Sequence, residues 1–313
     1  MLSAPGEVTS TATTVGIVGG GLMGRRIAGL VARAGLRAAI FDADAGVLHE
    51  ACLTAAELAP GAEVRAATSL TDCIAGADLV IEAVTENVDL KRRLFAEASH
   101  ANATAILASN SSVIPITMIA QDARDPSRCV GAHFWNPPDL IPIVEVVRGQ
   151  MTSDETMDRS FDLLTSMGKL PVRVERDVPG FVGNRIQHAL WREAIDLVAT
   201  GVCDPQTVDL VVRNTIGLRL GQMGPIENAD YVGLDLTLAI HEQVLPSINS
   251  DPYPSEYLRA LVSAGKLGAK TGQGFLAWTE DSREAAGQQL AAHVTAQLAG
   301  SSKRSNSPER NTP

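Results

Sequence analysis

Short apolar runs alternate with amphipathic segments over the first half of the chain. Apolar runs of this length, separated by helical patterns, predict βαβ units, in which a mostly parallel sheet is covered by helices on both faces. We therefore assign the first half to the α/β class, with a doubly wound sheet. The expected strands are Val15–Val18, Ala38–Phe41, Glu63–Ala67, Leu79–Ala83, Ala105–Ser109, Cys129–His133, Ile143–Val147 and Leu170–Val174. The expected helices between several of them are Leu22–Ala34, Ala45–Leu58, Asp89–His100 and Ser153–Met167.

The pattern changes near Asp177-Val178-Pro179-Gly180, and the chain after it is nearly all helical in character. Apolar residues between 181 and 199 recur at helical spacing, and further helices are expected over Pro205–Ile216, Tyr231–Leu245 and Ser255–Ala264. We therefore expect two domains, an α/β domain over 14–177 and an all-helical domain over 178–299. We also expect a flexible N-terminus over 1–13 and a disordered tail over 300–313, which is rich in Ser, Arg, Asn and Pro.

A glycine cluster follows the first expected strand. Gly19, Gly21 and Gly24 fit the pattern G-x-G-x-x-G. The first glycine permits a tight turn, the second lets the backbone approach a pyrophosphate, and the third lets helix and strand pack closely. The helix that opens with Leu22 and Met23 would then direct its N-terminus at the anion. The sequence therefore predicts a Rossmann-type domain that binds a dinucleotide.

An acidic residue, Asp42, ends the second expected strand. It comes eighteen positions after Gly24, close to the spacing of about 20 typical of dinucleotide sites. A carboxylate there accepts hydrogen bonds from a ribose 2′-hydroxyl and repels a 2′-phosphate. Residues 43–46 contain no arginine that could neutralise such a phosphate. The expected cofactor is therefore NAD rather than NADP.

The bulk properties exclude several classes of protein. The chain has 313 residues, enough for two domains, and a net charge of −10, which argues against a nucleic-acid partner. No apolar run has the length of a membrane span, and the first residues lack a signal-peptide pattern, so we expect a cytoplasmic protein without a membrane partner. The cysteines, Cys52, Cys73, Cys129 and Cys203, lack metal or redox spacing. We therefore expect free thiols and no metal site.

Polar residues follow the fourth expected strand. Glu86 and Lys91 come after the run Leu79–Ala83, at the edge of the sheet where ligands of α/β proteins bind. Both side chains could reach a cofactor or a substrate from this position. The residues alone are equally consistent with an exposed acid at a helix start and a surface lysine.

Two further strands end in polar groups, at Ser109–Ser112 and at His133–Pro138. Glu145 lies inside the otherwise apolar strand Ile143–Val147, and a buried carboxylate needs a partner. His133 is the expected partner, and a histidine oriented by a carboxylate makes a general base near neutral pH. Asn184 opens the first helix of the second domain, where it either faces the cleft or makes local hydrogen bonds.

With these motifs the chain resembles the 3-hydroxyacyl-CoA dehydrogenase family over about residues 13–280, with further similarity to gulonate- and carnitine-type dehydrogenases. The resemblance implies an NAD-dependent oxidoreductase whose second domain forms a homodimer. The matching motifs are G-x-G-x-x-G at 19–24, Ile-Glu-Ala-Val-x-Glu-Asn at 81–87, Ser-Asn-Ser-Ser at 109–112, His-Phe-Trp-Asn-Pro at 133–137, Val-Glu-Val at 144–146, Pro-Gly-Phe-x-x-Asn-Arg at 179–185, Gly-Pro at 224–225 and Gly-x-Lys-x-Gly-x-Gly-Phe at 268–275.

The resemblance also implies roles for the matching residues. His133 would remove the proton of the substrate hydroxyl while hydride passes to nicotinamide, and Glu145 would orient and stabilise it. Ser112 and Asn184 would hydrogen-bond the reacting oxygen or the thioester region. On the nicotinamide-ribose side the lining residues would be Glu86, Lys91 and Asn136.

The identity of the substrate stays open at this point. The family implies a short 3-hydroxyacyl-CoA, such as 3-hydroxybutyryl-CoA, and usually carries a basic helical hairpin after the second strand that helps to hold CoA. Here only about 36 residues separate Asp42 from Leu79, and Arg65 is their sole Lys or Arg. A non-CoA hydroxy acid, of the gulonate, carnitine or pyridoxine-catabolite type, is the alternative. A non-catalytic NAD(H)-binding protein is a third.

Overall fold

The computed structural model describes residues 13–301. The expectations of a flexible start at 1–13 and a disordered tail at 300–313 lie outside these residues, apart from Thr13 and the last two residues of the final helix. The chain forms two compact units that divide between Arg185 and Ile186, later in the chain than the expected boundary at residue 177. The intervening stretch makes hydrogen bonds and ring contacts with the first unit, which accounts for the difference.

The first unit is built on one eight-stranded sheet in the order β3-β2-β1-β4-β5-β6-β7-β8. All neighbouring strands are parallel except β6 and β7. The expected Rossmann-type sheet, mostly parallel, is therefore confirmed. The strands are β1 (Thr14–Val18), β2 (Arg37–Phe41), β3 (Val64–Ala66), β4 (Leu79–Glu82), β5 (Ile106–Ser109), β6 (Cys129–Phe134), β7 (Ile143–Val147) and β8 (Leu170–Val174).

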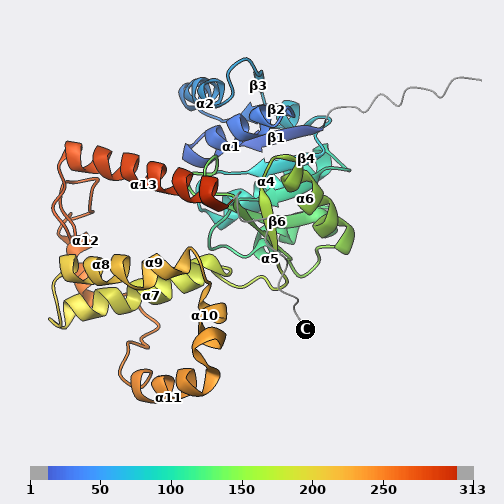
Figure 1. Ribbon diagram of the computed structural model, residues 1–313. Coiled ribbons are helices and arrows are strands. Elements are labelled where there is room, and N and C mark those ends of the chain that lie inside the picture. Colours follow the sequence, from blue (N-terminus) through green and yellow to red (C-terminus); the bar gives the residue numbers. More distant parts are fainter. Residues whose placement is uncertain (1–12, 302–313) are drawn as a thin grey trace, which may run out of the picture. The chain divides into compact units, whose positions relative to one another are not determined.

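Helices cover both faces of this sheet (Figure 1). One apolar layer joins the sheet to α1, α2 and α6, and the other joins it to α3, α4 and α5. The central strands are buried on both sides, as their continuous apolar runs predict. The helices of this unit are α1 (Leu22–Arg33), α2 (Ala45–Leu58), α3 (Leu70–Ile74), α4 (Val88–Ala101), α5 (Ile116–Ile119) and α6 (Asp154–Ser166), with short 3₁₀ turns η1 (Ala120–Asp122) and η2 (Pro126–Arg128).

The glycine cluster lies where the strand order reverses, between β1 and its neighbours β2 and β4. Gly19 has φ +105°, a conformation that favours glycine. A Cβ on Gly24 would lie 1.8 Å from the Gly19 carbonyl oxygen, so only glycine lets α1 pass this close to the turn. A Cβ on Gly21, by contrast, would meet nothing within 4 Å. The open space at Gly21 is where a ligand can approach the backbone.

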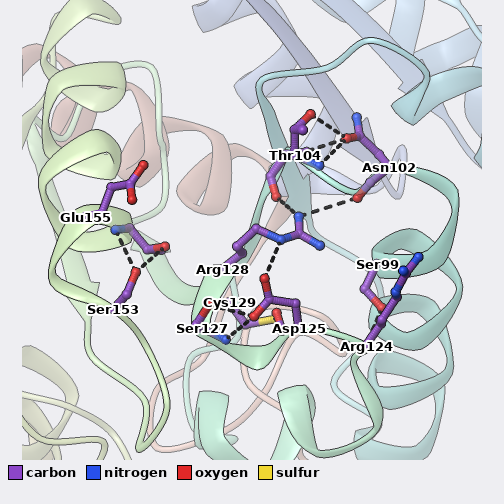
Figure 2. Close-up of polar contacts among 12 residues, drawn as sticks. Ser99, Asn102, Thr104, Arg124, Asp125, Ser127, Arg128, Cys129, Ser153 and Glu155 are labelled. Carbon is purple, nitrogen blue, oxygen red and sulfur yellow. Dashed lines mark hydrogen bonds and ion pairs between the residues drawn. The ribbon is translucent and has the colours of Figure 1, made fainter.

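The start of β6 is held by the Arg128 guanidinium, which Figure 2 shows among its partners. Its Nε lies 3.1 Å from Asp125 Oδ2, and the same side chain donates to the backbone carbonyl oxygens of Asn102 and Ala105. Asn102 in turn accepts hydrogen bonds from the backbone N–H groups of Thr104 and Ala105. These contacts tie the turn before β6 to the loop before β5, and so help to fix the register of the two strands.

Helices are the main regular elements in the described part of the second unit, which also has two isolated β-bridges at Gln273. Two expected helices are shorter than predicted. The segment Tyr231–Leu245 is broken by Gly233, whose φ is +102°, and the segment Pro205–Ile216 ends at Asn214. The helices are α7 (Gly183–Ala199), which begins in the first unit, α8 (Pro205–Asn214), α9 (Ile216–Leu220), α10 (Pro225–Val232), α11 (Leu234–Val244), α12 (Glu256–Ser263) and α13 (Glu280–Ser301).

Five α-helices were not expected from the sequence, because they lie wholly or mostly outside the expected ranges: α3, α5, α9, α10 and α13. The first three have only four or five residues, too few for a helical period to show, and α13 has no apolar face. The four cysteines are free thiols, as expected. Within residues 13–301 we find no helix that is both long and apolar enough to cross a bilayer.

The lack of space for a side chain at Gly24 leads to a prediction about stability. Replacing Gly24 by Ala should lower the free energy of unfolding by roughly 3 kcal/mol, because the added Cβ meets backbone that cannot move aside. Urea denaturation in the absence of nucleotide measures this. Gly21→Ala is the matched control and should leave stability nearly unchanged. Equal stability of the two variants would contradict the packing argument.

Candidate active site

His133 and Glu145 are directly opposite each other on the antiparallel strands β6 and β7. The His133 Nδ1 atom lies 2.7 Å from Glu145 Oε2, and both residues are almost fully buried, at 4% and 3% exposure. The pairing expected from the sequence is therefore present. A carboxylate can only accept a hydrogen bond, so Nδ1 carries the proton in this contact. That tautomer leaves the lone pair on Nε2.

The Glu145 carboxylate accepts hydrogen bonds from four donors. Besides His133, these are Trp135 Nε1 at 3.2 Å and the backbone N–H groups of Val182 and Gly183 at 3.0 and 3.1 Å. Burial raises the pKa of Glu145, but the hydrogen bonds from His133 and the two amides outweigh it, and the net pKa is lowered. Glu145 therefore stays charged at neutral pH.

This lowered pKa also links the site to stability. The pKa of Glu145 is lower in the folded protein than its ordinary value of 4.5. Its ionised form therefore stabilises the folded state at pH values above 4.5. That contribution is lost as the pH falls through the folded-state value.

Aromatic rings enclose the imidazole of His133. The ring centroids of Trp135 and Phe181 lie 5.3 and 5.7 Å from it. Phe181 is buried and has φ +49°, which is uncommon for a bulky residue and marks a tight turn before α7. A Cβ on Gly183 would come within 2.2 Å of the Trp135 indole, so only glycine lets the indole lie against this backbone. The segment 180–183 is therefore part of the histidine site.

A second buried charge cluster lies at the end of β4. Lys91 is 1% exposed, and its Nζ lies 2.7 Å from Glu82 Oε1 and 3.3 Å from Glu86 Oε2. Glu82 is also buried and accepts a hydrogen bond from Ser109 Oγ at 2.7 Å. The interpretation of Lys91 as a surface lysine is therefore wrong. A buried ammonium of this kind needs paired carboxylates, and here it has two.

Glu86 connects this cluster to the serine loop after β5. Its Oε1 accepts hydrogen bonds from Ser111 Oγ at 2.5 Å and from the backbone N–H groups of Ser112 and Val113 at 3.1 and 3.2 Å. Burial raises the pKa of Glu86, but the hydrogen bond from Ser111 and the charge of Lys91 have the larger effect. The net pKa is therefore lowered. The Glu86 side chain remains 37% exposed, so it is the member of the cluster that a ligand can reach.

Asn184 joins the same loop. Its side-chain Nδ2 donates to the backbone carbonyl oxygen of Ser112 at 3.2 Å. Within the described residues the Ser112 hydroxyl makes no hydrogen bond, and the residue is half-buried. Ser112 and Asn184 are thus neighbours, and the hydrogen bond of the Asn184 side chain is to a residue 72 positions away rather than a local one.

The dinucleotide loop has the properties that a pyrophosphate requires. Gly21 and Leu22 are exposed, Met23 is half-buried, and α1 has no side-chain cap, so its first N–H groups are free for an anion. Asp42 is half-buried at the end of β2, and its Oδ2 accepts a hydrogen bond from Gly20 N at 2.7 Å. The loop and Asp42 therefore fit a nucleotide with a free ribose diol.

Asn136 is exposed and precedes a cis peptide bond to Pro137. Its loop is held at two places. Lys169 Nζ donates to the carbonyl oxygens of Pro138 and Ile141, and Asp139 forms a 2.6 Å ion pair with Arg26 of α1. Burial lowers the pKa of Lys169 to about 8.

The structure adds residues to the two clusters that the sequence did not single out. These are Glu82 in the Lys91 cluster, and Trp135 and the amides of Val182 and Gly183 around Glu145. Glu82 ends an apolar strand and Trp135 follows the histidine closely, so each carried a weak signal, but backbone donors carry none. Burial raises the pKa of Cys73 and Cys129 to about 12, so neither thiol is a nucleophile. No cluster of three or more metal-ligating side chains occurs in the described part of the chain.

Comparison with known proteins agrees with this architecture. Residues 14–178 match the NAD binding domain of 3-hydroxyacyl-CoA dehydrogenase, and residues 180–278 match the C-terminal domain of the same family. A 5-formyl-3-hydroxy-2-methylpyridine 4-carboxylate 5-dehydrogenase of Mesorhizobium japonicum is 37% identical over 87% of this chain and 92% of its own length. A probable 3-hydroxybutyryl-CoA dehydrogenase of Deinococcus radiodurans is 38% identical over 83% of this chain and 98% of its own.

Solved structures show the same two kinds of relative. A crystal structure of the pyridine-carboxylate 5-dehydrogenase, described as an NAD⁺-dependent dismutase, superposes with a TM-score of 0.86 at 33% identity, over 91% of this chain and 97% of that one. The (S)-3-hydroxybutyryl-CoA dehydrogenase of Ralstonia eutropha gives 0.71 at 34% identity, over 86% and 100%. The chain is a member of the 3-hydroxyacyl-CoA dehydrogenase family, an NAD-dependent oxidoreductase with an N-terminal Rossmann-type domain and a helical C-terminal domain.

Proposed function

We propose that this protein oxidises a substrate hydroxyl group to a carbonyl, with His133 as the general base. The observation that carries the proposal is the 2.7 Å contact between His133 Nδ1 and the charged Glu145, which leaves Nε2 able to accept a proton. When bound, NAD supplies the hydride acceptor. The substrate hydroxyl proton passes to Nε2, its carbon-bound hydrogen leaves as hydride, and the carbonyl forms.

Glu145 stabilises the imidazolium that results, because its own negative charge is held by three further donors and does not depend on His133. Ser112 and Asn184 hydrogen-bond the reacting oxygen or the adjoining carbonyl group. The Ser112 hydroxyl is suited to this because it has no partner of its own among residues 13–301. The protein thus supplies proton transfer and orientation.

The cofactor is held by the loop and strand ends already described. The backbone of Gly19, Gly21 and Gly24, with Leu22 and Met23 at the start of α1, receives the pyrophosphate. The Asp42 carboxylate recognises the adenosine ribose by accepting a hydrogen bond from its 2′-hydroxyl. On the nicotinamide-ribose side, Glu86 and Asn136 contact the ligand through their exposed side chains, and Lys91, which is buried, contributes by holding Glu86.

The substrate that the charge distribution favours is a small hydroxy acid without coenzyme A. Between residues 43 and 90 the one Lys or Arg is Arg65, and it already forms a 2.8 Å ion pair with Asp72. No cation of this region is therefore left for the phosphates of CoA. The relative from Mesorhizobium japonicum, named as a pyridine-carboxylate dehydrogenase rather than a CoA enzyme, supports this choice. A short 3-hydroxyacyl-CoA is the second candidate, supported by the family and by the Deinococcus relative.

We further propose a homodimer that forms through the helical unit. None of the described residues 186–300 is buried, and large apolar side chains such as Leu218 and Ile226 are 71% and 77% exposed. A helical unit in which no apolar side chain is buried lacks the core that folding requires. A second copy of the chain would cover this surface.

A substrate panel tests the proposed function. Each of several small hydroxy acids is offered beside its CoA thioester, with NAD, and the formation of NADH is followed. We expect turnover, with kcat/KM higher for the free acids, because the region near the site offers no cations to CoA. A preference for the thioesters would establish the second candidate. NADH binding without turnover of any substrate would favour a non-catalytic NAD(H)-binding protein.

The histidine is tested by His133→Gln. The variant should lose roughly 10²–10⁴-fold in kcat, the usual contribution of a general base, while NADH affinity is unchanged. Steady-state kinetics and NADH titration measure the two properties. His188→Gln is the control, because His188 is exposed on α7 and its one ring contact within residues 13–301 is with Trp191. Full activity of His133→Gln would remove His133 from the mechanism.

The oligomeric state is tested by analytical ultracentrifugation of the full chain at micromolar concentration. A particle of twice the 33.0 kDa chain mass is expected. Replacing Leu236, which is 50% exposed on α11, by Asp should shift the equilibrium toward monomer, since a charge in a buried apolar interface is costly. A stable, well-folded monomer of the unmodified chain would contradict the proposal.

A further inference from the structure

One oxygen atom of Glu145 serves two different donors. Oε2 accepts from His133 Nδ1 at 2.7 Å and also from Trp135 Nε1 at 3.2 Å, whereas Oε1 accepts only from backbone amides. The two side chains that share Oε2 also touch each other, since their ring centroids are 5.3 Å apart with planes inclined by 55°. The indole therefore contacts both members of the His133–Glu145 pair.

We propose that Trp135 is a positioning residue that sets the basicity of His133. Its indole N–H donates a hydrogen bond to Oε2 and so offsets part of the negative charge on that oxygen. Glu145 therefore stabilises protonated His133 less strongly than it would without this donor. The inference rests on the proposed function, since the basicity of His133 matters only if this residue moves a proton.

The position of the indole is built into the surrounding backbone. A Cβ on Gly183 would lie 2.2 Å from the Trp135 ring, so the glycine makes the space in which the ring lies. The same Gly183 donates its N–H to the other oxygen of Glu145. One short segment therefore fixes both the carboxylate and the indole that shares it. A ring without an N–H, such as phenylalanine, could fill the space but could not donate.

Within residues 13–301, the ring of His133 has one hydrogen-bond partner and two aromatic neighbours, which makes the effect of the indole separable. The imidazole contacts Glu145 of β7, Trp135 just beyond β6, and Phe181 of the segment before α7. Glu145 is the one charged group of the three. The network of Glu82, Lys91 and Glu86 is a separate cluster with its own internal pairing. A change in the hydrogen bonding of Glu145 is therefore the direct route to a change in His133.

The sign of the effect follows from the charges. Removing the indole N–H leaves Oε2 with His133 as its remaining side-chain donor, so the carboxylate stabilises the imidazolium more strongly. The pKa of His133 should rise. A hydrogen bond to a charged group is among the stronger kinds, but only part of its strength reaches the neighbouring histidine, so we expect a rise of about half a pH unit to one unit.

The experiment compares Trp135→Phe with the unmodified full chain. The variant keeps an aromatic ring against His133 and loses the N–H. The His133 ring is titrated by NMR in protein labelled at histidine, and the acid limb of the pH profile of kcat/KM is measured in parallel. Both midpoints should move upward by the same amount. Trp191→Phe is the matched control, since Trp191 is on α7 and 49% exposed, and it should change neither midpoint.

A purely structural role for Trp135 predicts a different result. Loss of packing alone would lower kcat or stability and leave the His133 midpoint where it is. An unchanged or lowered midpoint in a folded Trp135→Phe protein would therefore overturn the proposal.

A second measurement needs no variant of Trp135. In the unmodified protein, the indole N–H signal of Trp135 should shift with pH at the midpoint of His133, because both donors share one oxygen. The chain has three tryptophans, so Trp191→Phe and Trp278→Phe assign the signal by elimination. An indole signal whose position does not change at the His133 midpoint would also overturn the inference. Lack of turnover across the substrate panel, with the NMR shifts as expected, would instead refute the proposed function alone.

Discussion

The charge of one buried carboxylate, Glu145, organises the site of this protein. A buried carboxylate is stable only if hydrogen-bond donors surround it, and here the donors come from the end of β6, the residue just after it, and the turn into α7. The single antiparallel pairing of the sheet, between β6 and β7, puts His133 directly opposite it. The same contacts therefore satisfy the carboxylate, set the tautomer of the imidazole and attach the segment around Phe181 to the α/β unit.

A second buried charge, on Lys91, organises another cluster of the same unit. Glu82 holds the ammonium inside the protein, and Glu86 carries the connection outward to the serine loop and so to Asn184. Removing one member would leave an uncompensated charge, so these residues are tied to folding as well as to function. Stability and activity are expected to change together at this cluster, whereas they should separate at His133.

Two neighbouring regions of the α/β unit differ in the ligand groups that they favour. The glycine loop and Asp42 suit an NAD pyrophosphate and ribose, through open backbone N–H groups and a carboxylate. The neighbouring α2–β3 region is acidic, and its one arginine is already paired. A polyanionic substrate would find little attraction there. The family resemblance alone therefore identifies the chemistry better than it identifies the substrate.

The sequence by itself determined the strands of the sheet, most of the helices and the glycine turn, because these follow from local spacing of apolar residues and from the backbone freedom of glycine. It also suggested His133 and Glu145 as partners, through the cost of an unpaired buried charge. Only the tertiary structure decided the antiparallel register that joins them, the burial of Lys91, and the indole of Trp135 on the shared oxygen. Those features depend on contacts between segments far apart in the chain, and no local pattern records them.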